Sequence, residues 1–251
     1  MFLRTLFPRR FGTAARRHAP IIGLLLALGL VCGCSHVPKV SVDWKGGPFF
    51  TPTNFEGAPL MPGDVRRVAV LPLAGVGSLT PESVTALEQA LQAALLDEGR
   101  FEIVPISPDF VRAVAGKPAL TSGDILPPAL FDRIAREQGA DAVLFVDITL
   151  YRPYSPLALG VRAKLARCDG VRTILWAFDT LFDAREPAVA NSARRHATGG
   201  RDAVVDVGPA ALQSPSRFAA YVFSDTFATL PKRPAPPPAP PKTKVSRHHA
   251  D

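Results

Sequence analysis

Hydrophobic and polar positions along residues 65–230 follow two periods, one typical of buried strands and one typical of amphipathic helices. Short, continuous apolar runs predict three strands, at residues 67–73, 101–105 and 142–151. Apolar or Ala-rich segments bounded by Ser, Thr, Pro or Gly predict four helices, at residues 80–99, 127–139, 187–200 and from Ser214 onwards. Because strands and helices alternate, the pattern predicts one α/β (α+β) domain at 65–230, a mixed sheet with helices packed on it.

Residues 157–183 predict a β-hairpin, because two segments of alternating polarity flank an Asp-Gly pair at 169–170. A two-residue type I′ turn at that pair would place Ala163 opposite Trp176 and leave Arg162 on the wetter face of the hairpin. A large ring opposite a small residue is expected where a helix packs on a sheet. We therefore expect Trp176 to be buried beneath one of the two early helices.

The first 35 residues have the pattern of a bacterial export signal. Residues 1–20 carry five arginines and no acid, and the apolar run that follows is too short to span a bilayer. The end of the run, Val31-Cys32-Gly33-Cys34, resembles a lipoprotein signal, in which cleavage precedes a cysteine that is then acylated. The resemblance implies a signal peptide at 1–33 and lipidation of Cys34. An uncleaved anchor helix with Cys34 unmodified, and export through the twin-arginine route, are the alternatives.

Ser35 extends this resemblance to a location. In lipoproteins of two-membrane bacteria, an Asp after the modified cysteine resembles a signal for retention at the inner membrane, and this chain has Ser35 there instead. The resemblance therefore implies anchoring at the periplasmic face of the outer membrane. Each buried methylene of an acyl chain contributes about 0.8 kcal/mol to membrane binding, and more than one chain anchors a protein stably. We expect Cys34 to be a tether rather than a reaction centre.

Pro and Gly set apart both ends of the domain. Residues 34–64 predict a lipid-anchored extended arm, whose aromatic side chains favour packing on its own domain, with a neighbouring subunit or the membrane surface as alternatives. Residues 231–251 contain seven prolines and predict a disordered, basic, polyproline tail. We expect this tail to be a semi-rigid spacer, and contact with acidic cell-wall polymer is the alternative.

The net charge of +7 arises at the ends of the chain rather than in the domain. Five of the 29 basic residues lie in 1–33 and five in 231–251, and one of the 22 acids is Asp251, which leaves 19 basic against 21 acidic residues for 34–230. A nucleic-acid-binding domain concentrates its basic residues on the fold itself. We therefore expect no nucleic-acid partner.

Candidate chemistry inside the domain is sparse, and no catalytic residue, cofactor or metal site is predicted. Cys168 is expected to be an inert, half-buried thiol, with a thiolate beside Lys164 as the alternative. The Gly75-Val76-Gly77-Ser78 turn follows a strand but lacks the third glycine of a dinucleotide-binding loop, because Thr80 stands there. Asp147 interrupts an apolar strand, and a buried carboxylate needs a partner.

The order of strands and helices resembles the small α/β domain shared by the curli-secretion lipoprotein, the N-terminal domain of TolB and lipoprotein activators of penicillin-binding proteins. The similar stretches are 67–73, 91–105, 140–150 and the hairpin through Leu175-Trp176. The resemblance implies a protein that is not an enzyme and that contacts other envelope proteins in assembly or export; the chain could also form a homo-oligomer. The alternative is a periplasmic small-ligand binder or enzyme that uses the Gly75-Val76-Gly77-Ser78 turn or Asp147.

Overall fold

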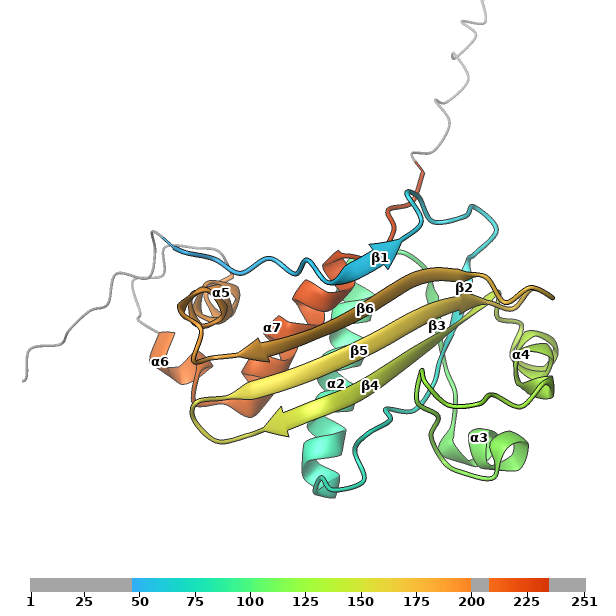
Figure 1. The fold of residues 1–251 in the computed structure, drawn as a ribbon, viewed down its shortest axis with the longest axis horizontal. Helices are drawn as coiled ribbons and strands as arrows, with labels where there is room; N and C mark the ends of the chain where they lie inside the picture. Colours follow the sequence, from blue (N-terminus) through green and yellow to red (C-terminus); the bar gives the residue numbers. More distant parts are fainter. Residues whose placement is uncertain (1–46, 200–207, 235–251) are drawn as a thin grey trace, which may run out of the picture. The chain divides into compact units, whose positions relative to one another are not determined.

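A six-stranded mixed sheet forms the centre of the domain, in the order β1-β6-β5-β4-β2-β3 (Figure 1). This computed structural model describes residues 47–199 and 208–234, so the predicted signal, Cys34 and most of the Pro-rich tail lie outside the described residues. The strands are β1 (Phe55–Gly57), β2 (Arg67–Val70), β3 (Glu102–Pro105), β4 (Ala142–Arg152), β5 (Ala158–Arg167) and β6 (Ile174–Asp183). The helical elements are α2 (Pro81–Glu98), α3 (Pro108–Ala115), α4 (Ala129–Arg133), the π-helical η1 (Ile134–Gln138), α5 (Pro187–Ala197), α6 (Gly208–Ala211) and α7 (Pro215–Ala228).

The sheet combines a parallel part and an antiparallel part, which confirms the predicted mixed sheet. β2 pairs in parallel with β3 and with β4, and parallel neighbours need crossover connections. Helix α2 supplies the crossover from β2 to β3, and α3, α4 and η1 supply the one from β3 to β4. β4, β5 and β6 are antiparallel and consecutive, and β1 pairs antiparallel with β6 at the edge.

Three helices begin at a hydroxyl N-cap followed by Pro. Thr80, Ser107 and Ser214 each accept a backbone N–H from the residue three positions later, at the starts of α2, α3 and α7. Helix α3 is an element that the sequence pattern does not predict. The helix is short and buries only Val111 fully, so its apolar stripe gives a weak signal.

One face of the sheet is covered by α2, α5 and α7 (Figure 1). Alternate residues of β4, β5 and β6 point into this layer, as the period of a strand requires. Aromatic side chains of β6 and α7 fill much of it: Trp176, Phe178, Phe182, Phe218, Tyr221, Phe223 and Phe227. This is the larger of the two hydrophobic cores.

The opposite face is covered over only part of its width. Helices α3 and α4 with η1 pack over β2 and the beginning of β4, where they form a second core. Its members include Ala69, Leu71, Val111, Leu130, Phe131, Ile134, Val143 and Phe145. Within the described residues, no helix lies over the remainder of this face, across the later part of β4 and across β5 and β6 (Figure 1).

The β5–β6 hairpin has a longer turn and a different register from those predicted. Leu165 pairs with Trp176 and Ala163 with Phe178, whereas a two-residue turn would pair Ala163 with Trp176. The turn closes through a hydrogen bond from Arg167 N to Thr173 O at 2.9 Å, with a bulge in the adjoining ladder. The prediction of a type I′ turn is therefore wrong. Because the register is shifted by two residues, Ala163, Leu165, Trp176 and Phe178 keep their predicted face, whereas Ile174, beside the bulge, pairs with Ala166 and is 58% exposed.

Trp176 is fully buried, as predicted, but the helix above it is α7. The indole Nε1 donates a hydrogen bond to Thr229 Oγ1 at 3.1 Å, just after α7 ends. The ring centroid lies 5.8 Å from that of Phe178 and 6.3 Å from that of Phe227. The expectation of an early helix is corrected, because the chain returns to this face only after the last strand.

Residues 47–64 pack on their own domain. Phe50 N donates to Ser192 Oγ at 2.9 Å, and Asn191 Nδ2 donates to Pro48 O at 3.1 Å. The guanidinium of Arg195 lies over the Phe49 ring, 3.9 Å from its centroid. Further along the arm, β1 adds an edge strand that the Gly- and Pro-rich sequence does not predict.

The last described residues also belong to the domain. Met61 N donates to Lys232 O at 2.9 Å, and the Arg233 side chain donates to Val65 O at 2.8 Å and to Arg100 O. The segment after α7 therefore runs beside the arm (Figure 1). In the part of the chain that the structure describes, none of the helices is both long and apolar enough to cross a bilayer.

Candidate functional site

The uncovered part of the sheet presents side chains from four adjacent strands, and we call this surface the open face. Paired residues in neighbouring strands lie on the same side of a sheet, so the strand register aligns these side chains in rows. The rows are Leu150, Gly160 and Leu181; Asp147, Arg162 and Asp179; and Lys164, Ala177 and Glu56.

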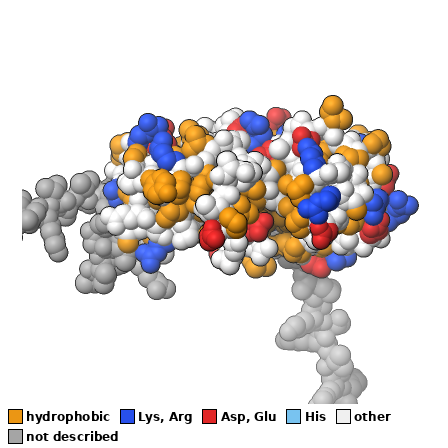
Figure 2. All heavy atoms as spheres, turned by 90° about the horizontal axis from the view of Figure 1, so that it is seen from below, with side chains coloured by type: hydrophobic (Ala, Val, Ile, Leu, Met, Phe, Trp, Pro, Cys, Tyr) orange, Lys and Arg blue, Asp and Glu red, His pale blue; other side chains and the backbone are white. Residues whose placement is uncertain are grey.

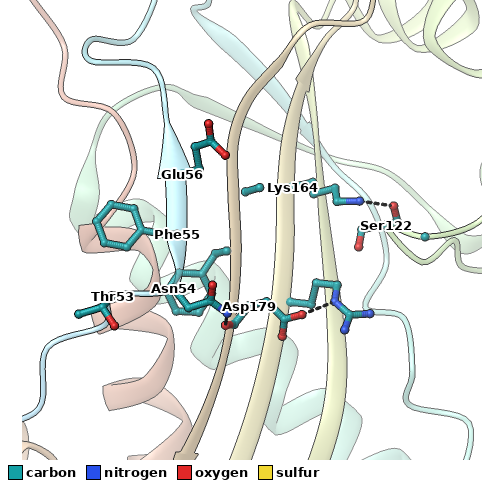
Figure 3. A pocket seen from close by; sticks show the side chains of 11 residues that line it. Thr53, Asn54, Phe55, Glu56, Ser122, Lys164 and Asp179 are labelled. Carbon is teal, nitrogen blue, oxygen red and sulfur yellow. Dashed lines mark hydrogen bonds and ion pairs between the residues drawn. The ribbon is translucent and has the colours of Figure 1, made fainter.

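Asp147, at one margin of the open face, is held by a loop residue, Ser122. The carboxylate accepts the backbone N–H of Ser122 at 3.0 Å and its hydroxyl at 2.6 Å. Burial raises the pKa of Asp147, and it outweighs the hydrogen bonds from Ser122 and the charges of Arg162 and Lys164. Lys164 Nζ donates to Ser122 O at 3.0 Å (Figure 3). Asp147 thus has the partner that its position in the strand requires, and together with Lys164 it fastens the loop to the sheet.

Arg162 and Asp179 form an ion pair at the centre of the open face. Arg162 Nε lies 2.7 Å from Asp179 Oδ2, and both side chains are nearly half exposed. An exposed pair of this kind contributes only about 0–1 kcal/mol to stability. Asn54, just before β1, joins the row through hydrogen bonds with the backbone of Asp179. The pair is therefore accessible to a binding partner at little cost to the fold.

A groove of about 520 Å³ lies over β1, β6 and β5, between residues 53–56 and the Ser122 loop (Figure 3). Its lining carries both signs of charge, with Glu56 and Asp179 against Arg162 and Lys164. This lining, all of it within the described residues, includes neither histidine nor cysteine, and the Ser122 hydroxyl is already engaged with Asp147. The groove therefore offers groups of both charges to a binding partner.

An apolar row borders the charged row. Leu150 and Leu181 are 41% and 48% exposed, and they stand on either side of Gly160. The Thr149 hydroxyl occupies the space of a Cβ at Gly160, only 2.3 Å away, so a larger residue does not fit between the leucines. The open face thus combines exposed apolar side chains with accessible charged groups, as protein interfaces do.

The Gly75-Val76-Gly77-Ser78 turn is pressed against the backbone of β4. Ala74 N donates to Val146 O at 3.1 Å, and Ile148 N donates to Ala74 O at 2.9 Å. At Gly75, where φ is +76°, a Cβ would lie 2.2 Å from Ile148 O. The glycine at this position is therefore required by the close approach of two backbone segments.

Cys168 lies beside the second core with three carboxylates around it. Burial, the largest cause, and the charges of Asp141, Asp169 and Asp132 together raise the pKa of the Cys168 thiol to about 12. The half-buried position of Cys168 and its raised pKa favour the thiol form over a thiolate beside Lys164, whose Nζ donates to Ser122 O instead. Among the described residues, no group of three or more His, Cys, Asp or Glu side chains is arranged to hold a metal ion.

Sequence patterns identified β4, β5 and β6 of the open face, but not the edge strand β1 or the Ser122 loop. The alternation along β5 places Arg162 and Lys164 on the wetter side, as the structure confirms. Ser122, Asn54 and Glu56 were missed, since a loop and a three-residue edge strand have no periodicity. A Ser or Asn in a Gly-rich segment gives no local sign of its distant partner.

No protein-family model and no curated protein matches this chain. Among solved structures, the chain is similar to the PelC dodecamer from Paraburkholderia phytofirmans, at 16% identity and a TM-score of 0.38, over 71% of this chain and 95% of that one. It is also similar to lipoprotein GNA1162 from Neisseria meningitidis, at 16% identity and a TM-score of 0.32, over 47% of this chain and 79% of that one. Both likenesses are distant, so the function of this chain has to be argued from its own residues.

Proposed function

We propose that this chain is a lipoprotein of the outer membrane, held at the periplasmic face through a lipid on Cys34, that acts by protein–protein contact in envelope assembly or export. The anchor is supported by the sequence alone: a basic start, a short apolar run, the Val31-Cys32-Gly33-Cys34 pattern and Ser35. A tether of this kind leaves the domain free to use its surface.

The observation that carries the contact function is the apolar row of the open face beside its charged row. A protein interface combines apolar anchors with polar and charged groups around them. The partner is a protein surface with apolar side chains opposite Leu150 and Leu181, and with an acid and a base opposite Arg162 and Asp179. Another face of the domain shows basic, acidic and hydrophobic side chains interspersed (Figure 2). That mixture supports a protein partner more than a nucleic acid, which favours a continuous basic surface.

The anchor is tested by replacing the modified cysteine. Cys34→Ala should abolish incorporation of an alkyne-labelled palmitate during growth, because the acceptor thiol is gone. Cys32→Ala is the matched control, two residues away, and should keep the label. Label recovered on the Cys34→Ala protein would contradict the lipoprotein assignment.

The contact surface is tested by photo-crosslinking in intact cells. A photoreactive residue at Leu181, on the open face, should yield a discrete protein adduct. The control position is Leu96 on α2, which is 68% exposed but belongs to the helical layer on the other side of the sheet. An adduct at a multiple of the chain's own mass would identify a second copy as the partner. The same adducts from both positions, or none from Leu181, would count against the open face.

A further inference from the structure

A second cluster of polar side chains lies away from the open face, between α5 and α7. A cavity of about 290 Å³ is lined there by Ser192, Arg195, His196, Gly199, Tyr221 and Asp225. All of these except the glycine carry a group that can ionise or form hydrogen bonds. The volume is at the lower end of the range for ligand cavities, which favours a small molecule.

Tyr221 provides the first sign that this cavity takes a ligand. The side chain is 1% exposed, and its hydroxyl is buried without a well-formed hydrogen bond to any described residue. Its polar neighbours are Ser192, whose oxygen already accepts the N–H of Phe50, and Asp225. Buried hydroxyls in native proteins almost always have a partner. A molecule bound in the cavity would supply one.

The charges of the lining provide the second sign. Arg195 of α5 and Asp225 of α7 both line the cavity, and Asp225 is affected by the charge of Arg195 without a hydrogen bond between the two. The exposed Arg195 guanidinium also lies over the Phe49 ring. Burial is the main reason that the pKa of Asp225 is raised to about 6, against the lowering effects of the nearby Tyr221 hydroxyl and of the charge of Arg195. The carboxylate is thus poorly compensated by the described residues around it. A ligand with a positive group near Asp225 and a negative group near Arg195 would satisfy both residues.

We propose that this cavity binds a small zwitterion of the α-amino-acid type, with its ammonium group on Asp225 and its carboxylate on Arg195. The Tyr221 hydroxyl is the hydrogen-bond partner between them. A simple anion would be repelled by the carboxylate of Asp225, and a simple cation would be repelled by the guanidinium of Arg195. A neutral polyol would leave both charges without a counterion.

The proposal is tested by titrating the intact chain, purified in mild detergent, with L-alanine while thermal unfolding is followed. L-Alanine should stabilise the protein saturably, because it binds only the folded state. Propionate and ethylamine each carry only one of the two charges. Each should bind at least about tenfold more weakly than L-alanine, which is the scale of one charged hydrogen bond. Glucose, a neutral polyol, should give no saturable shift.

Variants of the lining separate this site from a general effect on stability. Asp225→Asn and Arg195→Gln should each weaken L-alanine binding by about tenfold or more. Tyr221→Phe should weaken binding while the unliganded protein stays at least as stable, because a buried hydroxyl without a partner is removed. Arg194→Gln is the control, since that guanidinium bonds to Asn191 at 3.0 Å outside the cavity lining. It should leave binding unchanged.

The pH dependence gives an independent readout. L-Alanine affinity should fall from about pH 7 to about pH 5, because the ammonium group requires an ionised Asp225. The other titratable and charged groups around this site are Arg195 and His196 on α5, Tyr221 on α7 and Asp97 on α2. A His196→Gln variant should keep the pH dependence. Saturable stabilisation by glucose, absence of any shift with L-alanine, or unchanged binding in Asp225→Asn would overturn the proposal.

Discussion

Asp183 shows how one buried carboxylate fastens several elements. Its oxygens accept hydrogen bonds from Arg152 of β4 at 2.9 Å and from the Arg185 backbone N–H and Nε, at 3.0 and 2.9 Å, in the loop after β6. These contacts, with Arg185 the largest cause, lower the pKa of Asp183 to about 2. The end of β6 is therefore held to β4 and to the following loop by ion pairs as well as by packing.

This carboxylate should make stability depend on pH in the acid range. The pKa is lower in the folded state than the ordinary value of 3.8, so stability from this group is complete above that value and is lost as pH falls from 3.8 towards 2. Asp183→Asn should cost on the order of 2 kcal/mol at neutral pH and flatten that acid dependence. Urea unfolding at neutral and acid pH measures both. Asp109→Asn, in an exposed pair with Arg112, is the control and should change little.

Gly75 and Gly77 provide a matched pair within one turn. Gly75→Ala should destabilise the protein by about 2 kcal/mol or more, because it combines a positive φ with a Cβ in contact with Ile148 O. Gly77→Ala should change stability by less than about 1 kcal/mol, since nothing lies within 4 Å of a Cβ there. Chemical denaturation compares the two. Equal effects would mean that the turn is not held against β4.

At the scale of elements, helix ends follow local signals, whereas strand pairing does not. Thr80 and Ser214 cap the helices that the sequence predicts, and Gly99 and Gly139 end α2 and η1 in the left-handed conformation. The β5–β6 register depends instead on a bulge and on the fit of Trp176 against α7. A helix cap is a contact between residues close in sequence, so it can be predicted from sequence. A strand register depends on contacts between distant residues, so it cannot.

The segment after α7 gives an element-scale prediction about where the folded domain ends. Removing residues 235–251 should leave the melting temperature unchanged, because a polyproline segment forms no internal hydrogen bonds and adds no core. Removing residues 232–251 should lower it by about 2–4 °C or more, the scale of 1 kcal/mol in a domain of this size. The loss reflects the hydrogen bonds of Lys232 and Arg233 with the arm. Calorimetry of both truncations tests this, and equal melting temperatures would contradict it.

For the whole molecule, the two faces of the sheet have different roles. One face carries the larger core under α2, α5 and α7, and the other has a smaller core and the open face. Stability is therefore concentrated on one side of the sheet. The contact surface that we propose lies on the other side, where exposed residues can vary at little cost to folding.

Trp176 tests this division of the molecule. Trp176→Ala should cost about 3–5 kcal/mol, as for other core aromatics, because it leaves a cavity between β6 and α7. In the parent protein with Trp44→Phe, the remaining indole should emit at short wavelength and resist quenching by acrylamide. Trp176→Ala that folds with normal stability, or quenching as rapid as that of free indole, would contradict its place in the core.

The sequence by itself determined the α/β class, the mixed sheet, the main helices and the side to which each β5 residue points. These features follow from periodicity and capping, which depend on residues a few positions apart. Only the tertiary structure decided the helix above Trp176, the pairing of Asp147 with Ser122, the edge strand β1 and the cavity between α5 and α7. Each of these depends on contacts across long stretches of chain, 53 residues in the case of Trp176 and Thr229. Such contacts form only when the whole core packs, so they cannot be predicted from a local sequence pattern.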